Sequence, residues 1–464
     1  MDGSINMPIP DGVRSLMHRF VDNGYDAYII GGAVRDFVMG YPIKDYDIFT
    51  NATGDEILEL FPEGKILGGD ERQEKILTVI VDGIEVSSYR ANPERTKTGT
   101  SLDAHLATCD FRFNAMYADI DGHVFDPFGG GYDLRKGSIS CVGNPRNRIA
   151  EDRLRALRAV RFMCKYGIDS NGVHYGLLSE LINVDLSGIP AERIHDELLN
   201  ICEYEDAMNV LDKLHMLDKL IPEVAALRVD GGQHHAETVL EHSTFSFRHA
   251  RRLTDNTVLC LASFLHDIGK GPCREFVVDD SIIDADERKR VRFKKHNVVG
   301  SDMCRDILSR LKFSKADTDY IATLVQYHMF GFNMEHRKAV YIKLFSQLED
   351  NGVAVEDLLL LNYCDQQANL KNPRERYHEY LKRSVVLQKY YEYKYSKEPF
   401  RVKDLKVNGH DVMALGIPAG KGVGVVLSDA FEAVMDGLVS NNRGELLEYI
   451  ERYREEHSIG ELTS

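Results

Sequence analysis

The chain has 464 residues, of which 43% are hydrophobic and 28% are charged, and its formal net charge is −16. This length exceeds one ordinary core, so we expect about two to four domains. No run of about eighteen apolar residues is present, which excludes a membrane-spanning helix. The N-terminus lacks a secretory-signal pattern, and the eight cysteines are scattered without CxxC spacing. We therefore expect a cytoplasmic protein without a disulfide scaffold or a cysteine zinc site.

The acidic net charge argues against nucleic-acid binding, because phosphate contacts need Lys and Arg. The local charge differs from the total. Residues 135–165 contain nine basic residues, opposed only by Glu151 and Asp152, and a second basic run covers residues 288–295. An acidic chain can therefore still carry basic strips for phosphate groups.

The first part of the chain mixes helices and strands. We expect a helix over residues 11–24, a strand at 28–30, a helix at 34–39 and a strand at 47–49. Ile76–Val81 and Ile84–Ser88 alternate around Asp82-Gly83, which predicts a β-hairpin. Glycines at 129–131 mark the end of this region.

From Arg148 onward the pattern is helical, with turn residues near 222, 231 and 408. We therefore predict an α+β protein: a mixed α/β head at residues 1–135 followed by three all-α parts. These are a neck at 136–230, a body at 231–395 and a tail at 396–464.

A double glycine and two aspartates form the first candidate site. Gly31-Gly32 ends a predicted strand and opens a helix, so the backbone can approach a phosphate, and Arg35 adds a charged donor. Asp45 and Asp47 are two apart on a predicted strand, which puts both carboxylates on one side. Such a pair suits Mg²⁺, with Glu85 as a possible third carboxylate. The pattern favours two-metal phosphoryl transfer.

Gly31–Asp36 followed by Asp45-x-Asp47 resembles the head domain of class II tRNA nucleotidyltransferases, the bacterial CCA-adding enzymes, and of the similar bacterial poly(A) polymerases. These belong to the polymerase β-like nucleotidyltransferase superfamily. The resemblance implies that CCA is added to the tRNA 3′ end from CTP and ATP, with Asp45, Asp47 and Glu85 catalytic and Gly32 and Arg35 at the nucleotide.

A run of arginines gives the second candidate site. Glu151–Phe162 has strong helix propensity, and Asp152, Arg155, Arg158 and Arg161 are spaced three apart, so they wrap around one half of a helix. The alternative without a binding function is a solvated, salt-bridged helix. The segment resembles the family's neck motif, which implies that Asp152 and Arg155 pair with the base of CTP or ATP, with Arg158 and Arg161 also at the nucleotide. For Arg193 and Glu197 we favour a buried ion pair.

One segment departs from the family pattern. The family has two arginines before an aspartate, whereas this chain has Thr108-Cys109 before Asp110, the remaining nucleotide-binding candidate of the motif. Arg112 compensates for the missing arginine pair if it shares a strand face with Asp110. The segment 92–106 is also shorter than the family's mobile loop, which leaves the switch from C to A addition open.

Histidines and aspartates in the helical body form the third candidate site, because imidazole and carboxylate are ligands for divalent metals. Their ordered set resembles the HD phosphohydrolases. The resemblance implies that His242, His266, Asp267 and Asp365 hold one ion and that His296 and His328 help hold a second, with Mn, Ni, Co or Fe as the metal. The alternative is a metal-free relic. We assign His234, His235 and His249 to the surface or to packing.

Two rival functions remain. One is a poly(A) polymerase, or an enzyme that adds only CC or only A. The other is an HD phosphohydrolase with an RNA-binding head. The tRNA 3′ end, CTP and ATP are the expected partners, no membrane is involved, and the sequence leaves the oligomeric state open.

Overall fold

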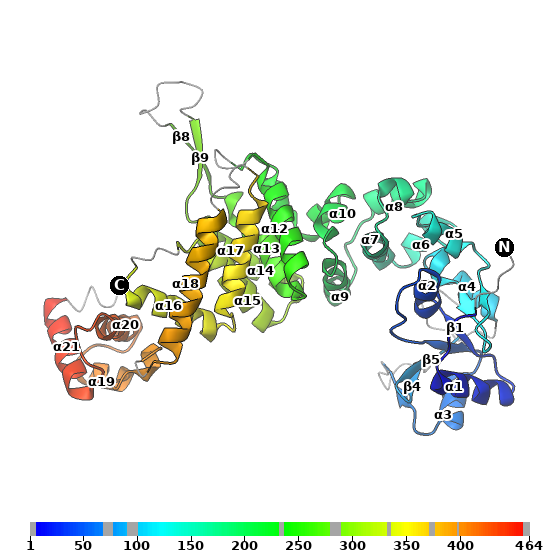
Figure 1. Cartoon of the computed structure of the whole chain (residues 1–464), viewed down its shortest axis with the longest axis horizontal. Coiled ribbons are helices and arrows are strands. Elements are labelled where there is room, and N and C mark those ends of the chain that lie inside the picture. The colour runs from blue at the N-terminus through cyan, green and yellow to red at the C-terminus, as the bar shows by residue number, and fades with distance from the viewer. Residues whose placement is uncertain are drawn as a thin grey trace. The chain divides into compact units, whose positions relative to one another are not determined.

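The computed structural model describes residues 6–67, 78–90, 101–231, 236–278, 289–331, 336–370, 376–396 and 399–457. The chain divides into two compact units, Met1–Leu220 and Ile221–Ser464 (Figure 1). Among the described residues, none of the helices is long and apolar enough to cross a membrane. The finer domain boundaries at residues 135, 230 and 395 stay predictions.

A seven-stranded mixed sheet forms the start of the first unit, in the order β3-β4-β5-β2-β1-β6-β7. Its strands are β1 (Tyr28–Ile30), β2 (Ile48–Thr50), β3 (Lys65–Ile66), β4 (Thr78–Val81), β5 (Ile84–Ser88), β6 (Tyr117–Ala118) and β7 (Val124–Phe125). β2 and β5 run parallel, and the other neighbouring strands are antiparallel. The predicted α+β class, with a mixed head, is confirmed.

Turn residues place two of these strands. The predicted hairpin is confirmed as β4 and β5, and Asp82 and Gly83 both have positive φ, as a two-residue turn of this hand requires. Ile76, the predicted start of the hairpin, lies outside the described residues. The strand predicted at 47–49 begins at Ile48, so Asp47 stands just before it.

Short helices surround the sheet. They are α1 (Asp11–Asp22), α2 (Gly32–Val38), α3 (Gly54–Leu60), α4 (Leu102–Ala107), the 3₁₀ turn η1 (Arg112–Asn114) and α5 (Gly130–Arg135). α1 buries Val13, Leu16, Met17 and Phe20, the three-to-four spacing of one helix face. The predicted helices at 11–24 and 34–39 are confirmed with ends shifted by one or two residues.

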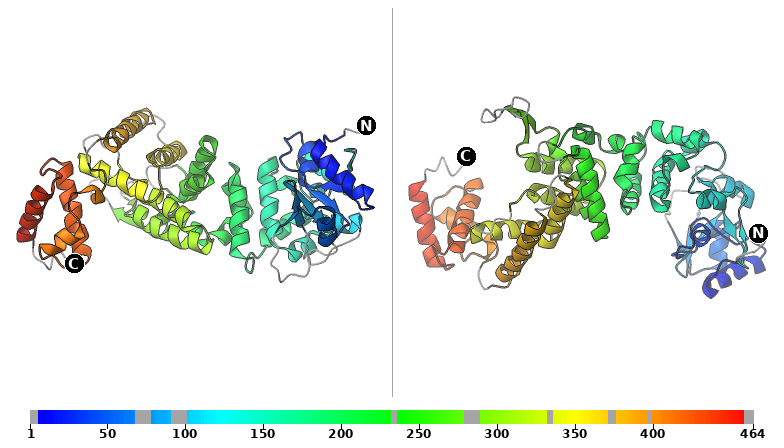
Figure 2. Two further views of the ribbon diagram at one scale, coloured as in Figure 1. Left: turned by 90° about the horizontal axis from the view of Figure 1, so that it is seen from below. Right: turned by 45° about the horizontal axis from the view of Figure 1, so that its top comes forward.

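The neck follows as a set of helices (Figure 2). They are α6 (Pro145–Glu151), α7 (Leu154–Tyr166), η2 (Ser170–Gly172), α8 (Tyr175–Asn183), α9 (Ala191–Cys202), α10 (Ala207–Lys213) and α11 (Leu217–Leu220). The single helix predicted over 151–162 is wrong, because Asp152 is extended and separates α6 from α7. Its carboxylate accepts the Leu154 N–H at 3.1 Å, a bond that competes with helix continuation.

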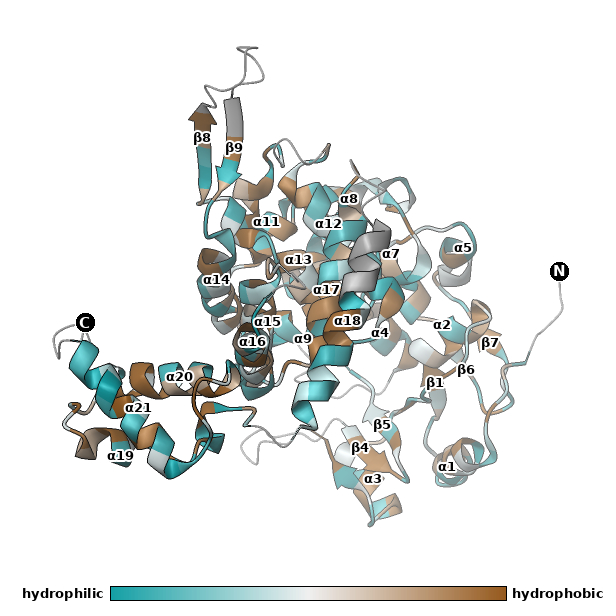
Figure 3. Cartoon of the chain, turned by 60° about the vertical axis from the view of Figure 1, so that its left-hand side comes forward, coloured by the Kyte–Doolittle hydropathy of each residue, from teal (hydrophilic) through white to brown (hydrophobic). Residues whose placement is uncertain are grey.

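Within its described residues, the second unit consists of helices and one hairpin. Its elements are η3 (Pro222–Leu227), α12 (Val239–Leu253), α13 (Thr257–Leu265), η4 (Ile268–Lys270), β8 (Arg274–Val278), β9 (Lys289–Phe293), α14 (His296–Arg310), α15 (Lys315–Tyr327), α16 (Lys338–Asp350), α17 (Val355–Ala368), α18 (Arg376–Lys394), η5 (Val402–Asp404), α19 (Gly409–Ala414), α20 (Lys421–Met435) and α21 (Arg443–Glu456). The last helices share an apolar core that includes Val412, Phe431, Leu446 and Ile450 (Figure 3).

A close backbone approach joins η4 to α14. A Cβ on Gly269 would lie 2.1 Å from the His296 carbonyl oxygen and 2.6 Å from the Gly300 nitrogen. Both neighbours are backbone atoms, so neither can rotate away. The absence of a side chain at Gly269 therefore lets α14 begin beside the chain that carries His266 and Asp267.

We predict that Gly269→Ala destabilises the second unit by about 2 kcal/mol or more, because overpacking against backbone forces α14 to move. Gly424→Ala in α20 is the matched control, since a Cβ there meets nothing within 4 Å and alanine favours a helix. Thermal unfolding followed by circular dichroism measures both. Equal melting temperatures for the two variants would contradict the prediction.

Candidate functional sites

Head and neck together line a cavity of about 440 Å³. The head contributes Gly31, Gly32, Arg35, Asp47 and Asp110, among others, and the neck contributes Asp152, Arg155, Arg158, Arg161 and Arg193. The structure thus brings together the predicted nucleotide-binding residues of both parts. Asp45 and Glu85 do not line this cavity.

The double glycine and Arg35 are fixed at one wall of the cavity. Gly31 has φ +84°, a conformation that favours glycine. Arg35 is buried, and its Nη1 donates to Asn114 Oδ1 at 2.6 Å. Its guanidinium also stacks on the Phe162 ring at 4.9 Å. The head arginine is therefore held against α7 of the neck.

Asp36 ties the head to the neck. Its carboxylate accepts from Lys165 Nζ at 2.9 Å and from the Tyr166 hydroxyl at 3.1 Å, both at the end of α7. Burial raises the pKa of Asp36, but Arg35 and Lys165 outweigh burial and leave this pKa below its usual value. An ionised Asp36 thus fixes α2 beside α7.

The three predicted catalytic carboxylates lie at neighbouring strands. β2 and β5 pair in parallel with Ile48 opposite Val86, so Asp47 and Glu85 stand next to each other. Burial, Glu85 and Asp45 raise the pKa of Asp47 to about 6. Asp45 and Glu85 are exposed. Mutual repulsion of this kind is what a bound cation relieves, so the donors fit a hard metal ion.

The predicted arginine ladder is present, and each member already has a partner. Arg155 donates to Glu151 at 2.6 Å, Arg158 to Asp110 at 2.7 Å and Arg161 to Glu197 at 2.5 Å. Asp152 accepts from Arg193 at 2.8 Å. The expected Arg193–Glu197 pair is therefore wrong, because each residue pairs with a ladder residue on the facing segment.

Asp110 lies at the centre of these contacts. It is buried, and its other oxygen accepts from Asn114 Nδ2 at 2.7 Å. Burial opposes its charge, but Arg158 and Asn114 outweigh burial and lower its pKa to about 2. Asn114 bonds both Asp110 and Arg35, a role that the sequence reasoning missed.

Arg112 does not compensate for Thr108-Cys109. It begins the 3₁₀ turn η1 instead of continuing a strand from Asp110, and its charge acts on Asp133. Arg90 stands at the altered segment, because it lines the cavity with Thr108 and Cys109. Its backbone N–H donates to His105 Nδ1 at 3.1 Å. Sequence reasoning missed Arg90, whose only signal is its place at the end of the hairpin strand that carries Glu85. Residues 92–100 of the predicted short loop lie outside the described residues.

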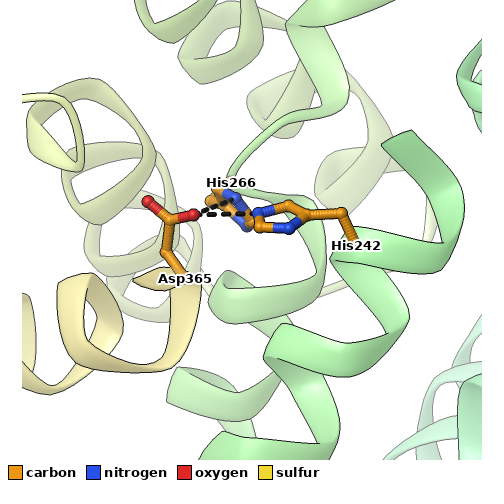
Figure 4. Close-up of side chains that lie close together, drawn as sticks. All are labelled: His242, His266 and Asp365. Atoms are coloured by element: carbon orange, nitrogen blue, oxygen red, sulfur yellow. Dashed lines mark hydrogen bonds and ion pairs between the residues drawn. The ribbon is translucent and has the colours of Figure 1, made fainter. Parts of the chain in front are cut away.

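In the second unit the structure brings all six predicted metal ligands together. The ligand atoms of His242, His266 and Asp365 lie within 4.8 Å of one another, as do those of Asp267, His296 and His328. Figure 4 shows the first group, with Asp365 facing both histidines. Asp267 stands between the groups, 3.2 Å from His266 Nε2 through Oδ2 and 3.3 Å from His296 Nε2 through Oδ1. The resemblance implies Asp267 as a ligand of the first ion alone, whereas its carboxylate faces both groups.

Backbone carbonyls fix the orientation of three of these imidazoles. Nδ1 of His266, His296 and His328 lies 2.8, 2.8 and 2.7 Å from a carbonyl oxygen. A carbonyl only accepts, so Nδ1 carries the proton and the neutral ring presents the Nε2 lone pair. Nε2 of His296 and His328 are 3.3 Å apart, and the buried Nε2 of His266 is 3.2 Å from Asp267 Oδ2. Facing lone pairs of this kind fit divalent metal ions.

Known families match two parts of the chain. Residues 27–140 match the poly A polymerase head domain, and residues 239–365 match the HD domain. The chain joins these two domains in one polypeptide. The resemblance predicted from the head motif and from the ordered histidines is confirmed at this level.

Curated relatives match part of this chain. Poly(A) polymerase I of Escherichia coli is 30% identical over 258 residues, 50% of this chain and 54% of the relative. The CCA-adding enzyme of Bacillus pumilus is 36% identical over 164 residues, 33% of this chain and 40% of the relative. The chain thus spans about half or less of the length of these relatives.

Solved structures extend the similarity in fold. The head-plus-HD chain aligns with the Bacillus stearothermophilus CCA-adding enzyme in complex with CTP over 96% of this chain and 97% of that chain. The TM-score is 0.64 and the identity is 22%. A Thermotoga maritima CCA-adding enzyme complexed with tRNA aligns at a TM-score of 0.52 and 17% identity. The fold of this head-plus-HD chain is therefore that of the CCA-adding enzymes.

Asp47 generates a prediction for the metal-free head domain. The pKa of Asp47 in the folded state is about 6, above the usual value of 3.8. As the pH falls, Asp47 is therefore protonated in the folded state before it is in the unfolded state, and the repulsion between the carboxylates weakens below pH 6. Asp47→Asn should stabilise the head by about 1–2 kcal/mol at pH 7.5, allowing for partial exposure, and less at pH 5. Thermal unfolding in EDTA measures this, with Glu59→Gln on α3 as control. A gain independent of pH would contradict it.

The HD cluster generates a second prediction. The parent and the variant His328→Ala are stripped with EDTA and titrated with Mn²⁺ by calorimetry. The variant should bind one ion fewer per chain than the parent, because one group of ligands is broken. His410→Ala, an exposed histidine in α19, should keep the parent stoichiometry. Equal stoichiometry in His328→Ala and the parent would remove His328 from the ligand set.

Proposed function

We propose that this chain adds CCA to the 3′ end of tRNA from CTP and ATP. The observation that carries the proposal is the cavity shared by head and neck, where Gly32, Arg35 and Asp47 face Asp152, Arg155 and Arg158. One side suits a triphosphate beside acidic groups, and the other offers a carboxylate and guanidinium groups to a base. The similarity to solved CCA-adding enzymes over nearly the whole chain supports the same function. An enzyme that acts on tRNA would work in the cytoplasm.

In the proposed reaction, the tRNA 3′-hydroxyl attacks the α-phosphate of the nucleotide. A bond forms between this oxygen and phosphorus, and the bond to the leaving pyrophosphate breaks. Asp45 and Asp47 would hold Mg²⁺, which when bound activates the hydroxyl and neutralises pyrophosphate charge, with Glu85 beside them. Arg35 and Arg90 would hold the phosphates, and Asp152 with Arg155 would read the base edge.

The HD domain would hydrolyse a phosphate ester. Its six ligands would hold divalent transition-metal ions, which when bound supply an activated water. Hydrolysis forms one bond from water oxygen to phosphorus, breaks one ester bond and leaves the proton on the departing oxygen. Asp267 stays ionised for this role, because the charge of Lys270, the largest of the stabilising effects, acts against burial, and the pKa of Asp267 is well below its usual value. Lys270 Nζ is 2.6 Å from Asp267 Oδ2.

One rival function has support of its own. The match to poly(A) polymerase I covers more of this chain than the match to the B. pumilus CCA-adding enzyme. A poly(A) polymerase, a CC-only or an A-only enzyme would use the same head chemistry. The other rival, a phosphohydrolase whose head only binds RNA, is disfavoured by the grouping of Asp45 and Glu85 beside Asp47, which raises the pKa of Asp47.

A single assay tests the proposed transfer. Transcribed tRNA lacking CCA is incubated with CTP, with ATP and with both. We expect two C residues with CTP alone and a terminal A when ATP is also present. Repeated A addition with ATP alone would indicate a poly(A) polymerase, and the absence of any C addition would overturn the proposal.

Variants in the same assay locate the site. Asp47→Ala should abolish extension, and Arg90→Ala should raise the KM for CTP and ATP by about tenfold, because a charged phosphate contact is lost. Arg112→Ala is the matched control and should keep the parent KM. Extension by Asp47→Ala at the parent rate would show that the metal site is misplaced.

A further inference from the structure

One wall of the HD cavity comes from the hairpin β8–β9. The cavity has a volume of about 510 Å³. It is lined by Asp267, His296, His328 and Asp365, and by residues 291–294, which are the end of β9 and the residue after it. The hairpin projects from the helices of the second unit (Figures 1 and 3).

Phe293 joins the hairpin to the metal-ligand cluster. Its carbonyl accepts from His296 Nδ1 at 2.8 Å, and Lys270 Nζ lies 5.4 Å from its ring centroid. The ring is half-buried and lines the cavity. An aromatic face held beside a phosphate site suits stacking with a nucleic-acid base.

Basic side chains continue from this ring. Among the side chains that the structure describes in residues 274–277 and 291–295, Arg274, Arg292, Lys294 and Lys295 are basic and Glu275 alone is acidic. Arg292 and Lys294 are exposed and line the cavity. Lys294 is 3.9 Å from Glu275, a weak surface pair. The wall is therefore locally positive in a chain of net charge −16.

We propose that the HD cavity takes the 3′ end of an RNA strand in preference to a free nucleotide. The terminal phosphate ester would lie at the metal-ligand cluster, the terminal base on Phe293, and the preceding phosphates along Arg292 and Lys294. A free nucleotide has no preceding phosphates, so it would use the cluster and Phe293 only. This inference rests on the proposed phosphohydrolase function.

The test compares two substrates with the same reacting group. Adenosine 2′,3′-cyclic phosphate and a short oligoribonucleotide ending in this group are hydrolysed with Mn²⁺ by the full chain. The parent should favour the oligonucleotide, and the double variant Arg292→Ala/Lys294→Ala should lower the ratio of kcat/KM values, oligonucleotide over mononucleotide, by about tenfold. Lys315→Ala, an exposed lysine on α15 that does not line the cavity, is the control and should keep the ratio.

Salt dependence and binding complete the test. For the oligonucleotide, the slope of the logarithm of the binding constant against the logarithm of the salt concentration should become less steep by about 1.4, because two phosphate contacts are lost. A double variant with an unchanged ratio and slope overturns the inference. If the parent hydrolyses neither substrate, the proposed phosphohydrolase function fails, and fluorescence anisotropy with the labelled oligonucleotide decides the inference: weaker binding by the double variant supports it, and equal binding overturns it.

Discussion

The ion pair between Asp110 and Arg158 is the contact on which the first unit depends. Asp110 belongs to the head and Arg158 to α7 of the neck, and Asn114 extends the chain of bonds from Asp110 to Arg35. Asp110 is buried, so removal of Arg158 would leave a charge without its compensating partner, which is far more costly than loss of an exposed pair. Together with Asp36 and Lys165, this network holds the two walls of the cavity between head and neck in one arrangement.

The second unit reaches a similar end by different means. Three of its histidines are held by backbone carbonyls at Nδ1, and Gly269 approaches α14 closely beside them. The head therefore relies on charged side-chain networks, whereas in the HD cluster main-chain carbonyls orient three of the four imidazoles. Main-chain partners fix which imidazole nitrogen faces the metal positions without adding charge to the site.

Much of this organisation follows from the sequence. Local signals such as Asp82-Gly83 and Gly31 predicted the hairpin and the turn, because their backbone conformations depend on few neighbours. Ordered histidines predicted the HD cluster, whose six residues the fold does assemble. Partner choice was harder: Arg193 meets Asp152 and Arg161 meets Glu197, and only the packing of α9 on α7 decides this. Likewise Arg90 comes near Cys109 through strand order, which spacing along the chain cannot show.

The Asp152–Arg193 pair has a consequence for selectivity. Before a nucleotide arrives, the acceptor proposed to read the base is already bound to an arginine whose side chain is 48% exposed. An exposed pair of this kind contributes only about 0–1 kcal/mol, so a base can replace the arginine at small cost. A base that offers no donor to Asp152 leaves the pair intact and gains nothing. Under the proposed function, Arg193 would thus compete with the base for Asp152, and only a matching base would displace it.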